Sequence, residues 1–97
     1  MSTELDVLEV TKFKRPSKWV VVLHNDDTTP MDFVIELLHY VFDMKIDDAT
    51  HLMITIHTEG QGAAGIYPHE IAEQKLSEAK MFIDLTPYPM RTTLEQE

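Results

Sequence analysis

The run Trp19-Val20-Val21-Val22-Leu23 is the feature that most constrains the fold. Continuous apolar residues rich in β-branched side chains predict a strand that is covered on both faces. A polar stretch, residues 24–30, separates this run from a second apolar segment, residues 31–42. The second segment is predicted to be helical, because its polar residues recur at intervals of four, three and four: Asp32, Glu36, His39 and Asp43. A covered strand and a mostly buried helix share one core, which puts the polar stretch at its edge.

The ends of two helices can be predicted from individual residues. Thr29 is expected to cap the first helix, with Pro30 at the first helical position and Asp32 completing a capping box. Asp47 is expected to cap a second helix, and Gly60 to end it.

The rest of the chain supplies two more strands and a third helix. We expect strands at residues 63–67 and 90–95, the latter a half-exposed edge strand, and a helix that begins near His69. Its inner face is predicted to consist of Ile71, Ala72, Leu76, Ala79, Phe82 and Ile83. Residues 1–17 show no sustained period and are predicted to be a flexible arm, leaving residues 18–97 as the folded domain. The order strand, helix, helix, strand, helix, strand predicts a small α+β domain with its helices on one side of the sheet.

Composition excludes several classes of protein. A chain of 97 residues, 43% of them apolar, can bury a single core. Without cysteine, it has neither disulfides nor a cysteine-bound zinc site. No apolar run approaches the roughly 18 residues of a membrane helix, and no signal-peptide pattern stands at the start. The sequence therefore predicts a cytoplasmic protein.

The charge is strongly and unevenly acidic. The net charge is −9, and because three acids and three bases balance within residues 1–15, the whole deficit lies in residues 16–97. Such a domain would repel phosphate backbones and anionic lipid, which argues against nucleic acid and membranes as partners. Cationic or amine-bearing partners are favoured.

The polar stretch contains more hydrogen-bonding groups than a helix cap requires. Its residue types suit a turn and a cap on structural grounds alone. However, Asn25, Asp26 and Asp27 precede Thr29, which is already expected to cap. Their amide and carboxylate oxygens can accept all three N–H donors of an amine, so this stretch, between two apolar elements, suits a small cation with an apolar group.

Four further residues could complete such a site. His57 lies four positions after Met53 near the end of the second helix, where its polar tip could emerge from an apolar wall. Met31, Met53 and Met90 could line that wall, since flexible thioethers accept several shapes. The alternatives are that His57 is a packing residue and that the methionines fill the core.

An enzymatic reading is weaker. His39/Asp43 and Asp47/His51 are each four apart on predicted helices and could ligate a metal ion, as in a metal-dependent hydrolase. Both pairs lie on stripes expected to face solvent, and no third ligand has a clear spacing. No nucleophile accompanies the adjacent carboxylates of the polar stretch.

The string from Val22 to Val34, VLHNDDTTPMDFV, resembles the signature of the ClpS adaptors. These small proteins hand N-degron substrates to a Clp-family AAA+ unfoldase and its peptidase. Further matches are residues 49–53, His57, residues 65–67, residues 70–75 and residues 93–95, so the resemblance covers residues 17–97 in order.

The resemblance implies a fold, a function and a site. The fold would be a three-stranded antiparallel sheet packed against three helices. The protein would be an adaptor, not an enzyme, with no cofactor, that binds a free N-terminal Leu, Phe, Tyr or Trp and delivers the substrate to a ClpA- or ClpC-type unfoldase. The α-amino group would be held by Asn25, Asp27 and His57, with Asp26 adding charge and backbone contacts. The side-chain cavity would be lined by Thr29, Met31, Val34, Met53, Ile56 and Met90.

Within that cavity, Met31 would act as the gate against β-branched residues. Outside it, on the third helix, Glu70 and Lys75 would dock on the unfoldase. A monomer is expected. The alternative within the family is a regulatory domain that docks on the unfoldase and inhibits other substrates without delivering N-degrons.

Overall fold

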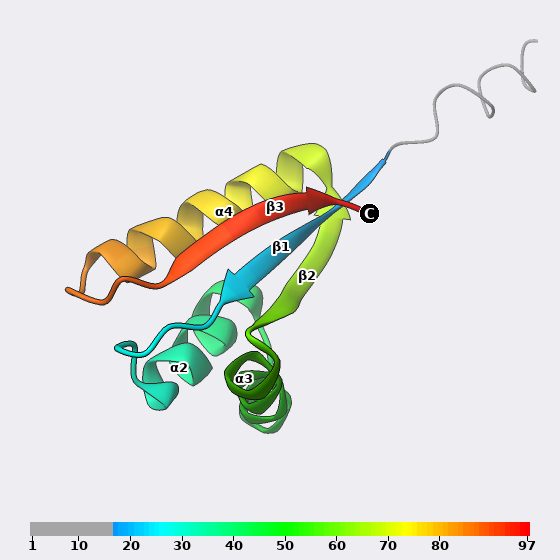
Figure 1. The fold of residues 1–97 in the computed structure, drawn as a ribbon. Coiled ribbons are helices and arrows are strands. Elements are labelled where there is room, and N and C mark those ends of the chain that lie inside the picture. The colour runs from blue at the N-terminus through cyan, green and yellow to red at the C-terminus, as the bar shows by residue number, and fades with distance from the viewer. Residues whose placement is uncertain (1–16) are drawn as a thin grey trace, which may run out of the picture.

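Three strands and three helices follow one another in the predicted order β-α-α-β-α-β (Figure 1). The computed structural model describes residues 17–97, so the predicted arm lies outside the described residues except for Ser17. The elements are β1 (Lys18–His24), α2 (Met31–Phe42), α3 (Ile46–Glu59), β2 (Gln61–Pro68), α4 (His69–Asp84) and β3 (Arg91–Gln96).

The sheet has the order β2-β1-β3, and β1 pairs antiparallel with both neighbours. The strand with the strongest β-forming sequence is therefore the central one, and β3 is an edge strand as predicted. Leu23 near the end of β1 is paired with Gly62 on one side and Thr92 on the other. The antiparallel α+β fold expected from the sequence is confirmed.

One face of the sheet carries the core. Val21 and Leu23 are fully buried and join a cluster with Leu37 and Leu38 of α2 and Ala72 of α4. Helix α4 contacts all three strands, while α2 packs on α3 and α4. In Figure 1, α4 runs along the sheet, and α2 and α3 gather near the end where β1 stops and β2 starts.

The other face of β1 is not covered by a helix in residues 17–97. Val20 and Val22 line a hollow of about 670 Å³ there, together with Ala63 of β2. Val22 is nevertheless only 4% exposed, while Val20 is half-buried. The expected cover is therefore complete on the core face and only partial on this one, since an apolar run reports burial and not which elements cause it.

One helix start and one helix face also differ from prediction. Helix α3 begins at Ile46 with Lys45 at the N-cap, so Asp47 lies inside the first turn, where its charge favours the helix dipole. Ile71 is 44% exposed and not on the inner face of α4, because it lies beside the buried stripe that contains Ala72. Gly60 ends α3 as expected: its φ is 93° and its N–H donates to the carbonyl of Ile56.

Candidate functional site

The loop between β1 and α2 is organised by the carboxylate of Asp26. Its Oδ1 accepts the backbone N–H groups of Thr28 at 2.8 Å and of Thr29 at 2.7 Å. The hydroxyl of Thr29 donates to Oδ2 at 2.7 Å. Pro30 is the N-cap of α2, and no side chain bonds to the start of that helix. The prediction that Thr29 caps the helix was therefore wrong, because its hydroxyl is held by Asp26.

This hydrogen bonding changes the acidity of Asp26. Partial burial acts to raise the pKa of its carboxyl group, but the bonds from the backbone and hydroxyl of Thr29 and from the backbone of Thr28 favour the charged form more strongly. The pKa therefore lies below its ordinary value. Asp26 holds the loop in shape as an anion.

The loop is also tied to the end of α3. The backbone N–H of Asn25 donates to the carbonyl of Gly60 at 2.9 Å. Because Gly60 directly follows the last turn of α3, this bond brings the strand end beside that turn. His57, which lies in the turn, is thereby placed next to the loop residues.

A cavity of about 470 Å³ lies between this loop, α2 and α3. It is lined by Asn25, Asp26, Asp27, Thr28, Thr29, Pro30, Met31, Val34, Met53, Ile56 and His57. Every residue predicted for the site is among them except Met90. Thr28 and Pro30 also line the cavity without having been predicted for it; their position inside the polar stretch was the available signal.

The cavity has an apolar floor and a polar rim. Val34, Met53 and Ile56 are 6%, 8% and 1% exposed. Asn25 and Asp27 on the loop are exposed, as is His57 across the cavity on α3.

The side chains of Asn25, Asp27 and His57 make no hydrogen bond or ion pair to the rest of residues 17–97. A carboxylate, an amide oxygen and an imidazole nitrogen are acceptors suited to an ammonium group. The arrangement can therefore bind an amine at the rim while an attached apolar group enters the cavity.

Met90 lies elsewhere. It is 7% exposed, belongs to the core cluster, and lines a separate hollow between α4 and β3 with Ile83 and Thr92. A methionine suits a cavity wall and a core equally well, so residue type alone could not predict which of the two Met90 would join.

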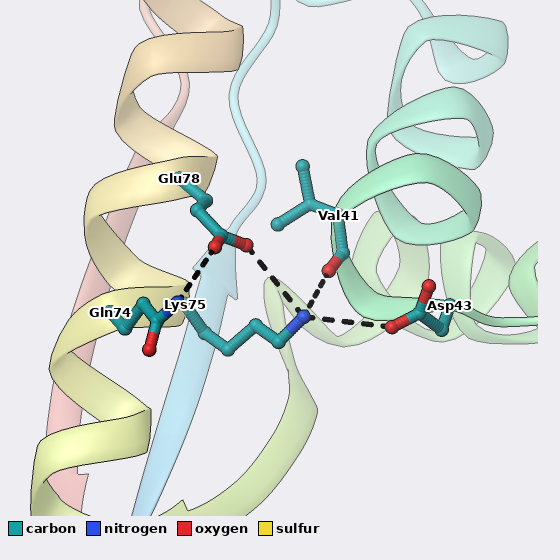
Figure 2. Close-up of polar contacts among 5 residues, drawn as sticks. All are labelled: Val41, Asp43, Gln74, Lys75 and Glu78. Atoms are coloured by element: carbon teal, nitrogen blue, oxygen red, sulfur yellow. Dashed lines mark hydrogen bonds and ion pairs between the residues drawn. The ribbon is translucent and has the colours of Figure 1, made fainter.

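The two residues expected to dock on an unfoldase lie on α4, away from the cavity. Glu70 is in the first turn and exposed. The ammonium of Lys75 donates to the carbonyl of Val41 at 2.8 Å and lies 3.6 Å from Asp43 and 3.7 Å from Glu78 (Figure 2). Lys75 thus joins α4 to the C-terminal end of α2, where a cation interacts favourably with the helix dipole.

No group of three or more His, Asp or Glu side chains that could hold a metal ion occurs in residues 17–97. The Nδ1 of His39, from one of the predicted ligand pairs, lies 2.7 Å from the carbonyl of Met44 and donates to it, since a carbonyl only accepts. Within the same range, no helix has the length and apolar character needed to cross a membrane.

Fold and cavity together define a small α+β domain with a cavity whose lining suits an amine attached to an apolar group. The family model of the ATP-dependent Clp protease adaptor protein ClpS matches residues 14–93. Curated relatives include the ATP-dependent Clp protease adapter protein ClpS of Vibrio atlanticus (strain LGP32), 47% identical over 91% of this chain and 83% of that protein. The ClpS of Shewanella halifaxensis (strain HAW-EB4) is 45% identical over 88% of this chain and 83% of that protein.

A solved structure has the same architecture. Agrobacterium tumefaciens ClpS2 bound to L-phenylalaninamide aligns with a TM-score of 0.82 and 36% identity, over 86% of this chain and 100% of that one. The chain belongs to the ClpS family and is an adaptor of an ATP-dependent Clp protease.

Proposed function

We propose that this adaptor binds the free α-amino group and the bulky apolar first residue (Leu, Phe, Tyr or Trp) of N-degron substrates and delivers them to a ClpA- or ClpC-type unfoldase. The observation that carries the proposal is the cavity, where unpaired polar groups stand on the rim of a buried apolar floor. An N-terminal residue carries both matching groups, a charged α-amino group and a side chain, on its Cα. The complex of Agrobacterium tumefaciens ClpS2 with L-phenylalaninamide, an aromatic residue with a free amine, supports it.

The rim residues have separate roles in this proposal. Asn25, Asp27 and His57 accept hydrogen bonds from the ammonium group. Asp26 contributes negative charge but chiefly keeps the loop in shape, since both its oxygens are occupied by Thr28 and Thr29.

The apolar residues receive the substrate side chain. Thr29, Met31, Val34, Met53 and Ile56 line the cavity, and Met31, 47% exposed at the start of α2, is the gate that disfavours β-branched first residues. Met90 is proposed to support the wall from within the core cluster that it shares with Val34 and Met53.

The expected affinity is modest. Two or three charge-assisted hydrogen bonds at about 1.5–3 kcal/mol each, and about 1.5–3 kcal/mol for burying a Leu or Phe side chain, favour binding. Lost freedom on association costs several kcal/mol, which leaves a Kd on the order of micromolar. An adaptor that must release its substrate is suited to this range.

Delivery is proposed to use α4. Glu70 would contact the unfoldase directly, and Lys75 would act there through the cluster that fixes α4 against α2. No cofactor or catalytic step by the adaptor is required.

The decisive experiment is a titration with labelled peptides that differ only at residue one: Phe, Leu, Trp, Val and N-acetyl-Phe. The first three should bind, Val should bind weakly, and acetylation should nearly abolish binding because the rim acceptors lose their charged donor. Equal affinity for all five would reject the proposal and favour a domain that only docks on the unfoldase.

A further inference from the structure

The five methionines within residues 17–97 differ in how accessible they are to oxidants. Met53 in the cavity floor and Met90 in the core are 8% and 7% exposed, and Met44 is packed against the core. Met31 and Met81 are 47% and 67% exposed. Met31 lines the cavity, whereas Met81 is on the outer surface of α4 and lines neither this cavity nor the two hollows beside β1 and β3.

We propose that Met31 is a redox modification site: hydroperoxides convert it to the sulfoxide, which closes the cavity to apolar first residues. With hydrogen peroxide, the sulfur attacks one oxygen and an S–O bond forms as the O–O bond breaks; the departing hydroxide takes the proton of the sulfur-bound hydroxyl, leaving the sulfoxide and water. The sulfur is oxidised by two electrons, and the peroxide is reduced. The inference rests on the proposed function, since it concerns the same cavity.

The physical consequence follows from the position of Met31. A flexible apolar thioether becomes a polar group with a strong acceptor oxygen. That oxygen would stand where the substrate side chain passes, with Val34 and Met53 offering it no hydrogen-bond donor. Either the sulfoxide turns outward and the apolar wall is lost, or it is buried without a partner, and both weaken binding.

The modification is also reversible. Methionine sulfoxide reductases return the thioether at the expense of a dithiol, which becomes a disulfide. A chain without cysteine has no thiol that competes for the peroxide, so exposed methionines are its most reactive sulfur atoms.

The test treats the full chain with hydrogen peroxide, maps sulfoxides by peptide mass spectrometry, and titrates a labelled peptide that begins with Phe. Three proteins are compared, each with its own untreated form: wild type, Met31→Leu and Met81→Leu. Treated wild type and treated Met81→Leu should lose about tenfold or more in affinity, treated Met31→Leu should change less than twofold, and reductase with a dithiol should restore the wild type.

Two results would overturn the inference: unchanged affinity of wild type once Met31 is mapped as sulfoxide, or an equal loss in treated Met31→Leu. Failure of the proposed function is distinguishable, because untreated wild type would then not bind the Phe peptide at all.

Discussion

At the scale of residues, two adjacent carboxylates have different tasks. Asp26 accepts three hydrogen bonds from its own loop, whereas Asp27 is exposed and has no partner in residues 17–97. Nothing in their residue type separates them. The first is a structural anion and the second is the one free to meet a ligand.

We expect Asp26→Ala and Asp27→Ala to separate stability from binding. Asp26→Ala should lower the free energy of unfolding by about 1 kcal/mol and weaken peptide binding, because the donors of Thr28 and Thr29 lose their acceptor. Asp27→Ala should weaken binding with little change in stability. Urea denaturation and peptide titration of both variants check this; a stable Asp26→Ala that binds normally would contradict the assigned role.

The lowered pKa of Asp26 predicts that the difference in free energy of unfolding between wild type and Asp26→Ala depends on pH. A depressed pKa in the folded state stabilises the fold above the unfolded value of 3.8, and that contribution is lost as pH falls through the folded pKa. The stability gap between wild type and Asp26→Ala should therefore narrow below pH 3.8. Urea denaturation at a series of pH values measures this difference in stability. A difference that grows as pH falls would contradict the prediction.

At the scale of elements, the cavity depends on how closely β2 approaches α3. A Cβ placed on Gly62 of β2 would lie 2.8 Å from Cγ1 of Ile56 and 3.1 Å from Cδ1 of Leu52. Ile56 is 1% exposed and lies in the cavity floor. Because Gly62 has no side chain, Ile56 can sit back toward β2, which leaves the cavity deeper.

Gly62→Ala should therefore push Ile56 toward the cavity. We expect destabilisation of about 1–3 kcal/mol from overpacking. We also expect a larger loss of affinity for a Trp first residue than for Leu, since the cavity becomes shallower. Peptide titration with the two first residues measures the ratio. Gly60→Ala is the matched control: its Cβ would have nothing within 4 Å, so only the positive φ is strained and the ratio should not change.

The contact between α4 and α2 carries a second prediction. Lys75→Met removes the donor to the carbonyl of Val41 and should lower the free energy of unfolding by about 1–2 kcal/mol. Binding of the Phe peptide should persist, because the cavity does not include this cluster. Lys80→Met, an exposed lysine on the same helix, is the control and should change stability by less than about 0.5 kcal/mol. Equal effects of the two substitutions would remove the special role of Lys75.

At the scale of the whole molecule, the net charge of −9 accumulates in residues 16–97, which include the rim carboxylates. Such a field raises the local concentration of cationic groups around the domain. It also makes the approach of an N-terminal ammonium group dependent on ionic strength.

Association of Phe peptides should therefore slow severalfold between low salt and about 0.5 M NaCl, as salt screens the field. A peptide with two extra lysines beyond residue four should show the steeper dependence. Stopped-flow fluorescence gives the on-rates. Rates independent of salt for both peptides would show that steering plays no part.

Much of the fold could be predicted from the sequence because it depends on local patterns. The β-branched run of β1, the helical spacing after Met31 and the αL stop at Gly60 each report a conformation that nearby residues determine. The polar loop and His57 were also predicted as one site, and the structure brings them to the same cavity.

By itself, the sequence determined the order of elements and the chemical character of the loop, since both follow from residue type and spacing. Only the tertiary structure decided that Asp26 turns into the loop, that Thr29 does not cap α2 and that Met90 lines a different hollow. The reason is physical. Side-chain directions in a tight loop depend on backbone torsions fixed by contacts distant in sequence, such as the bond from Asn25 to Gly60, and no local pattern contains them.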